Sequence, residues 1–290
     1  VVKETQDMVG ARINKVLQYS DKFIALECFK TGVGRVFINV CRPGLFWKGS
    51  SKSISGDFGF HKNLATFIEG AKISKILLIG GERIVKIDLS TADKEFVLYI
   101  ELFNKGEMVL CNPEGKILCL WETQLWKDRQ LKVGAQYSLP KKLINIFSMS
   151  EEEFNNAFHV ISESVSKTLA AELGIGGLYA NELCAISGID KNKNKLTAEE
   201  SRVLFANLHY LFERKMDART VYENNAVKDI VPFALKVYES FKQASFASYS
   251  LAIDGVMSAV EQKDQNTKAL SQFESKKKKL HNIIEVQKLH

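Results

Sequence analysis

A succession of short apolar runs, separated by turn residues, occupies the first 120 residues of the chain. β-branched and aromatic residues dominate the runs, and Gly, Ser, Asn or Asp stand between them, which is typical of antiparallel strands. We expect strands at 13–19, 23–29, 35–40, 73–79, 84–89, 96–102, 108–111 and 117–120. Between or before them we expect the end of a helix, a polar loop and a short helix, at 1–9, 43–59 and 61–69. This part of the chain therefore predicts a β-rich unit with one or two helices on it.

A glycine-rich turn lies between two segments whose apolar residues have helical spacing. The spacing covers 154–172 and again 178–186, and Gly174, Ile175, Gly176 and Gly177 lie between them. Glycine allows backbone conformations that reverse the chain sharply, so successive N–H groups can point outward at the start of a helix. Such a helix start can bind an anion. An ordinary antiparallel helix pair, whose glycines only cap and turn, explains the same pattern.

The rest of the chain predicts one more helix, a hairpin and a long helical tail. Thr197 with Glu200 three residues later predicts a capped helix start, and this helix extends to about residue 215. Two short β-like runs around an Asn-Asn turn predict a hairpin over 217–233. The tail, 251–290, lacks Pro and spaces its apolar residues as a helix does, so we expect the start of a coiled coil.

Net charge, cysteine spacing and the length of apolar runs argue against several classes of protein. The 290 residues carry a formal net charge of +6, which is a weak indication of an anionic partner. The five cysteines have no Cys-x-x-Cys spacing, which argues against a zinc site or a disulfide framework and favours a reducing, cytoplasmic compartment. No apolar run is long enough for a membrane span, and no signal peptide is recognisable. Because the sequence starts at Val1 and stops within a helical pattern, we expect a piece of a longer protein.

Ordered blocks of sequence along the chain point to a known family. They are Gly-Ala-Arg-Ile at 10–13, Gly-Gly-Glu-Arg-Ile-Val at 80–85, Glu-Leu-Phe-Asn-Lys-Gly-Glu at 101–107, an Arg, Gly, Tyr and Pro series at 129–140, and the glycine turn with its flanks at 169–192. Together they resemble the NFACT family, the ribosome quality control proteins also labelled fibronectin-binding protein A-like. The chain departs from the family pattern at Glu82, where the family has Asp, and at Glu107, where Asn is usual. At Ala65 and Thr66 it lacks the two positive charges that the family usually has.

The resemblance implies an α+β fold with four parts. Residues 1–140 would form a β-rich domain similar to the N-terminal domain of formamidopyrimidine-type DNA glycosylases. Residues 141–216 would be an inserted helical unit with a helix-hairpin-helix motif, and 217–250 would return as a hairpin that completes the first domain. Residues 251–290 would begin a coiled-coil arm.

The resemblance also implies which residues hold nucleic acid. The family's Asp-Arg pair, represented here by Glu82 and Arg83, is implicated in handling transfer RNA. The Arg guanidinium presents donors suited to a phosphate or a guanine edge, and the neighbouring carboxylate can orient it. A solvated ion pair at a strand end is the alternative for these two residues. The full set of expected nucleic-acid-binding residues is Glu82, Arg83, Gly174, Ile175, Gly176, Gly177, Lys191 and Arg12.

The function implied is non-enzymatic binding of RNA. NFACT proteins bind a large ribosomal subunit that carries obstructed peptidyl-transfer RNA, and they help to add C-terminal residues to the stalled chain. Bond formation belongs to the ribosome. The expected partners are the large ribosomal subunit and peptidyl- and aminoacyl-transfer RNA, with no cofactor, no metal ion and no membrane. Self-association or a partner contact through 251–290 is a further expectation.

Two other functions fit parts of the sequence. A glycosylase-like DNA repair enzyme would need a Pro or Lys amine nucleophile, a carboxylate and usually a zinc finger. The sequence shows neither an N-terminal Pro-Glu pair nor a cysteine cluster. An extracellular fibronectin-binding adhesin is disfavoured by the missing secretion signal and by the pattern of cysteines.

Overall fold

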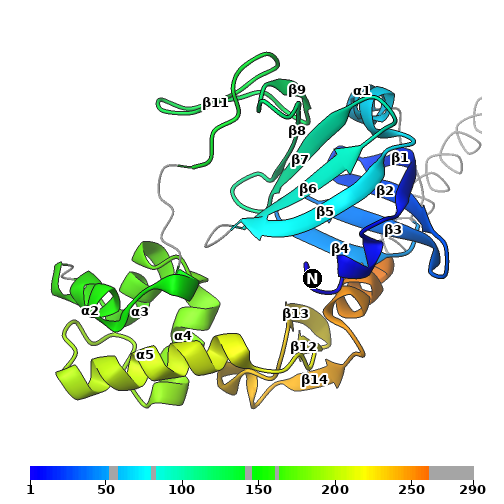
Figure 1. Cartoon of the computed structure of the whole chain (residues 1–290). Coiled ribbons are helices and arrows are strands. Elements are labelled where there is room, and N and C mark those ends of the chain that lie inside the picture. The colour runs from blue at the N-terminus through cyan, green and yellow to red at the C-terminus, as the bar shows by residue number, and fades with distance from the viewer. Residues whose placement is uncertain (52–57, 80–82, 141–145, 161–162, 261–290) are drawn as a thin grey trace, which may run out of the picture.

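The computed structural model describes residues 1–51, 58–79, 83–140, 146–160 and 163–260 (Figure 1). These residues form a large antiparallel sheet with one helix, a helical unit, and a small sheet followed by a further helix. The expected combination of helices with a large antiparallel sheet is confirmed. The predicted coiled coil lies outside the described residues from position 261 onward.

The large sheet contains nine of the described strands, in the order β4-β3-β2-β1-β5-β6-β7-β8-β9. Neighbouring strands pair over most of their length, except that β1 meets β5 only at Arg12 and Lys72. The sheet therefore divides into two halves at this junction. The strands are β1 (Arg12–Ser20), β2 (Phe23–Lys30), β3 (Gly34–Cys41), β4 (Leu45–Gly49), β5 (Lys72–Ile79), β6 (Ile84–Ser90), β7 (Glu95–Glu101), β8 (Glu107–Cys111) and β9 (Ile117–Leu120).

Both halves of the sheet contribute to one apolar core. Successive side chains of a strand point to opposite faces, so each strand buries alternate residues where only one face is covered. Ile24 from the first half and Ile87 from the second are fully buried in this core. Helix α1 (Gly59–Ile68) packs against β1 and β9. Its own residues Leu64 and Ile68, one helical turn apart, are fully buried on the side that faces the sheet.

Two expectations for the first unit are wrong. Residues 43–59 were expected to be a polar loop, but they contain β4, whose Phe46 and Trp47 are buried. The Trp47 Nε1 donates to the Asp254 carboxylate at 3.0 Å, a partner far along the chain that local sequence does not reveal. Residues 1–9 contain turns and a short 3-10 helix, η1 (Gln6–Met8), in place of the end of an α-helix.

The helical unit follows a short hairpin of β10 (Gln124–Leu125) and β11 (Gln130–Leu131). The prediction of one helix over 154–172 is wrong, because the structure has separate elements there. The backbone N–H groups of Val165 and Ser166 donate to Lys193 and Lys191 carbonyls, so a new helix starts at this point. The elements are η2 (Ile146–Ser148), α2 (Glu151–Val160), α3 (Val165–Lys167), the π-helix η3 (Thr168–Glu172), α4 (Gly176–Ser187) and α5 (Ala198–Glu213).

Helix α5 begins as the sequence predicts. The Glu200 N–H donates to the Thr197 hydroxyl at 3.2 Å, and the Thr197 N–H donates to the Glu200 carboxylate at 2.8 Å. This reciprocal capping box satisfies two backbone donors that a helix start otherwise leaves unpaired. The prediction of a capped helix at Thr197 is confirmed.

Residues 217–250, called the return segment below, contain a three-stranded sheet of their own, in the order β13-β12-β14. Its strands are β12 (Arg219–Glu223), β13 (Ala226–Val231) and β14 (Lys242–Ser245), and the 3-10 helix η4 (Lys236–Tyr238) precedes β14. Asn224 and Asn225 have φ of +51° and +62°, the conformation that a two-residue hairpin turn needs, so the predicted Asn-Asn hairpin is confirmed.

The small sheet connects the large sheet with the helical unit (Figure 1). On one side, Val221 and Val231 pack with Leu211 of α5 and Leu178 of α4. On the other, Ile230 packs in the cluster of Trp47 and the large sheet. The chain then continues as a helix over 249–260, whose first N–H groups donate to the Glu4 carboxylate.

Candidate nucleic-acid interface

A cleft of about 650 Å³ lies between one end of the large sheet and the helical unit. Figure 1 shows this end of β5 and β6 pointing toward the helical unit. The cleft is lined by Arg83, Phe103, Asn104, Pro140 and residues 170–179. Arg83 and the glycine turn 174–177, which lie far apart in the sequence, therefore face the same space.

Arg83 is held by its backbone and exposed at its side chain. It precedes β6, and its carbonyl accepts the N–H of Leu102 at 2.7 Å, which fixes it to the end of β7. No described residue forms a hydrogen bond or an ion pair with its guanidinium. A guanidinium with unused donors suits a phosphate. Glu82, the other half of the expected pair, lies outside the described residues.

The glycine turn opens the start of α4 to the cleft. Gly174 and Gly176 have φ of +75° and +77°, which other residues adopt only with strain. A Cβ placed on Gly174, Gly176 or Gly177 would meet nothing within 4 Å, so the space above the turn is open. In the described part of the chain, no side chain caps α4 at its N-cap residue Ile175. The first N–H groups of α4 and its dipole are therefore available to an anion.

The structure leaves two of the expected residues out of the cleft. Arg12 pairs with Lys72 at the start of β5, whereas Arg83 follows its end, so about 23 Å of strand separates them. The Arg12 Nη1 donates to the Gly70 carbonyl at 3.2 Å, a local contact. Lys191 lines a separate hollow beside α4. The strand order decides the position of Arg12, and the loop that follows α4 decides that of Lys191; the sequence blocks reveal neither.

Other cleft residues were not expected from the sequence. Asn104 has φ of +53° in the turn between β7 and β8 and lies with Phe103 on the wall formed by the sheet. Both belong to the block at 101–107, which carries the family resemblance but did not predict a binding role for either residue. Tyr179 lies on the opposite wall. Burial, followed by the nearby charges of Tyr249 and Asp229, raises the pKa of Tyr179, so this phenol stays neutral at pH 7.

Two sequence blocks of the large sheet have a structural role. Glu101, only 3% exposed, accepts the Tyr137 hydroxyl at 2.9 Å and forms a bidentate ion pair with Arg129. This contact joins the Glu-Leu-Phe block to the exit block and fixes the segment that leads toward the helical unit. Glu107, at the usual Asn position, accepts the backbone N–H of Trp121 at 2.7 Å and the Gln124 amide at 2.6 Å.

Among the residues that the structure describes, no helix is long and apolar enough to cross a membrane. In the same part of the chain, no group of three or more His, Cys, Asp or Glu side chains is arranged to hold a metal ion.

The whole sequence was then compared with known proteins. The family model described as NFACT N-terminal and middle domains matches residues 1–289. The chain belongs to the NFACT family. The resemblance in the sequence blocks is thereby confirmed.

A curated relative and two solved structures are similar to this chain. "Archaeal Rqc2 homolog aRqcH" of Methanocaldococcus jannaschii is 28% identical over 233 residues, which cover 76% of this chain and 34% of the relative. The chain thus spans about a third of that relative's length. A fibrinogen-binding protein from Staphylococcus aureus matches with a TM-score of 0.73 at 16% identity, over 87% of this chain and 94% of that one. The N-terminal part of a fibronectin/fibrinogen-binding protein from Streptococcus suis matches with a TM-score of 0.68 at 19% identity, over 89% and 96%. These structural likenesses show a shared fold.

Proposed function

We propose that this NFACT chain is the RNA-binding part of a cytoplasmic ribosome quality control factor, and that the cleft grips transfer RNA. The observation that supports the proposal is that Arg83 and the glycine turn 174–177 line one cleft. The similarity to an archaeal Rqc2 homolog supports the same role.

In this proposal, two walls of the cleft hold one phosphate backbone. The N–H groups at the start of α4 bind one phosphate, because they carry no side-chain cap among the described residues and lie at the positive end of the helix dipole. Arg83 binds a neighbouring phosphate or a guanine edge from the opposite wall. Glu82, adjacent in sequence, orients the guanidinium or accepts from a base amine.

The chain acts by positioning RNA and performs no bond formation itself. In this account it holds transfer RNA on a large ribosomal subunit with an obstructed peptidyl-transfer RNA, and the ribosome adds residues to the stalled chain. The helix-hairpin-helix motif around the glycine turn 174–177 supplies the grip, and a partner contact through 251–290 is part of the same proposal. No metal ion or cofactor takes part.

Binding of the chain to purified transfer RNA and to a DNA duplex with and without a damaged base tests this function. The measurement is fluorescence anisotropy across a salt series. We expect tighter binding to transfer RNA, with the logarithm of affinity falling linearly with the logarithm of salt concentration. A preference for the damaged duplex would favour a repair protein instead, and an absence of binding to either nucleic acid would contradict the proposal.

A further inference from the structure

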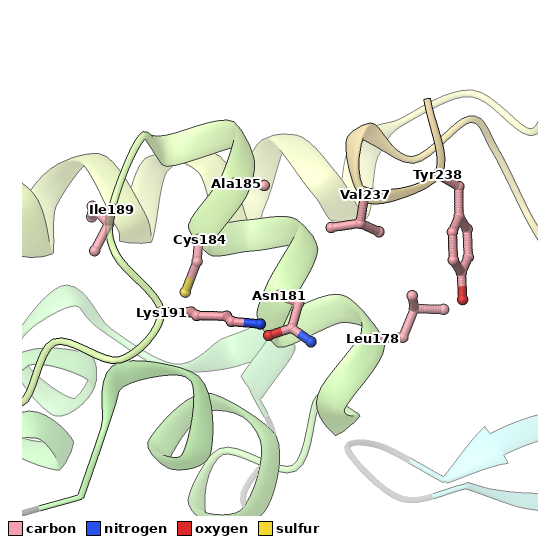
Figure 2. A pocket seen from close by; sticks show the side chains of 8 residues that line it. All are labelled: Leu178, Asn181, Cys184, Ala185, Ile189, Lys191, Val237 and Tyr238. Atoms are coloured by element: carbon pink, nitrogen blue, oxygen red, sulfur yellow. The ribbon is translucent and has the colours of Figure 1, made fainter. Parts of the chain in front are cut away.

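A second hollow, the α4 groove, lies beside the same helix (Figure 2). Its volume is about 380 Å³. One face of α4, the loop that follows α4, and η4 form its walls. The lining residues are Leu178, Asn181, Cys184, Ala185, Ile189, Lys191, Val237 and Tyr238.

Two polar groups face this mostly apolar groove. Figure 2 shows the Lys191 ammonium and the Asn181 amide close together, with Cys184 and Ile189 toward one end and Leu178, Val237 and Tyr238 toward the other. Neither polar group has a hydrogen bond or an ion pair to any residue that the structure describes. A hollow with apolar walls and a few unsatisfied polar groups is typical of a ligand site.

Tyr238 provides a fixed aromatic wall. Its hydroxyl donates to the Asp229 carboxylate at 2.9 Å, and its ring packs edge-to-face on Phe241 with 5.5 Å between centroids. Burial, followed by the hydrogen bond to Asp229, raises the pKa of Tyr238 to about 12, so the ring is neutral. A ring already held in place loses little conformational entropy when a flat group packs against it.

The groove adjoins the cleft. Leu178 lines both hollows, and α4 begins only two residues earlier, at Gly176. From Leu178 to Ala185 the groove follows about 10 Å of helix. An RNA strand whose phosphates cross the glycine turn would therefore have the groove beside its next bases.

We propose that the α4 groove takes one unpaired base of the RNA held at the cleft; this inference rests on the proposed function. The Asn181 amide offers one donor and one acceptor to the base edge, a pattern that matches adenine best. Lys191 neutralises the phosphate of that nucleotide, and the apolar walls with Tyr238 cover the base. Proteins that recognise RNA by sequence use unpaired bases in this way.

The test compares two RNA hairpins with the same stem, one blunt and one with an unpaired adenine tail, and each is bound to the wild-type chain and to Asn181→Leu. Leucine keeps the number of side-chain heavy atoms and the branch at Cγ, and it removes the hydrogen bonds. We expect Asn181→Leu to lose about fivefold to tenfold in affinity for the tailed RNA, as expected for about one or two lost hydrogen bonds, and to bind the blunt RNA unchanged. The matched control is Asn156→Leu, at an exposed position of α2.

Two more readouts separate this groove from the cleft. Replacing the tail adenine with a fluorescent adenine analogue that keeps the 6-amino group and N7, such as 8-vinyladenine, reports burial of the base, and we expect a change in emission with the wild-type chain that Ala185→Phe, which fills the groove, abolishes. Equal affinity of the wild-type chain for the blunt and tailed RNAs would overturn the groove proposal and leave the cleft intact. Failure to bind either RNA would overturn both. Displacement of the tail by an acidic peptide at equal concentration would assign the groove to a protein partner and would also overturn it.

Discussion

Glu182 accepts the backbone N–H of Lys236 at 2.9 Å, and its side chain has no exposed surface. Its second oxygen accepts the N–H of Val237 at 3.0 Å, and Arg214 lies 3.9 Å away. Glu182 belongs to α4, the helix that starts at the glycine turn, whereas Lys236 and Val237 belong to η4 of the return segment. This contact therefore ties one wall of the cleft to the small sheet, which in turn packs on the large sheet.

Removing the Glu182 carboxylate should destabilise the fold. In Glu182→Ala, two backbone N–H groups lose their buried acceptor and Arg214 loses its ion-pair partner, so we expect a loss of about 3 kcal/mol in the free energy of unfolding. Glu182→Gln keeps one acceptor and should lose less. Denaturant unfolding measures both. Glu213→Gln, at an exposed position of α5, is the control. If Glu182→Ala were as stable as this control, the contact would not hold α4 to the return segment.

Acid should weaken the docking of the helix over 249–260. Burial raises the pKa of Glu4, but the hydrogen bonds donated by Ser250 and Tyr249 outweigh this effect, so the pKa lies below its ordinary value of 4.5. A lowered carboxyl pKa contributes stability that is present above pH 4.5 and is lost as pH falls below it.

The variant Glu4→Gln tests this pH dependence. We expect it to lose about 1 to 2 kcal/mol relative to the wild type at pH 7, because a neutral amide replaces the carboxylate that accepts these hydrogen bonds. The difference should shrink below pH 4.5, where the wild-type carboxyl is protonated in the unfolded state and loses its advantage in the folded state. A difference that is constant across this range would contradict the assignment.

Local sequence predicted most of the large sheet but not the elements that depend on distant partners. Alternating and β-branched runs decide strand formation within a few residues, so the strands other than β4 were expected at nearly their observed positions. Trp47 lies in a segment rich in Gly and Ser, and its burial in β4 depends on Asp254. The break before Val165 depends on carbonyls of the loop at 191–193. Neither partner is visible in the local pattern.

The candidate site was predictable only where its residues have a local signal in the sequence. The glycine turn and the Glu-Arg block each have a local chemical signal, and the structure places Arg83 and the glycines in one cleft. Lys191 was expected among the nucleic-acid-binding residues because it belongs to the block at 169–192 that resembles the family. The chain carries it past the end of α4, so it faces a different hollow. Only the packing of α4 against η4 shows that this hollow exists.

Substitution of Gly176 should reduce RNA binding beyond its effect on stability. Alanine at φ of +77° is strained by about 1 to 2 kcal/mol, and relief of this strain would turn the first N–H groups of α4 away from the cleft. We expect Gly176→Ala to bind transfer RNA at least about fivefold more weakly. Gly32→Ala is the matched control, because Gly32 has φ of +82° and equally open space in the turn between β2 and β3. Equal affinities of the two variants would mean that the glycine turn does not bind the backbone.

The proposed contact between Arg83 and RNA across the cleft is tested most directly by measuring transfer RNA binding of Arg83→Ala beside Arg35→Ala. Both variants lose one exposed guanidinium and one unit of charge, but only Arg83 lines the cleft. We predict that Arg83→Ala weakens binding by about 1 to 3 kcal/mol and lowers the slope of log affinity against log salt by about 1. Arg35→Ala should change the affinity less than about twofold. Equal, small losses of affinity in both variants would contradict a contact between Arg83 and RNA and leave the cleft without a role in binding RNA.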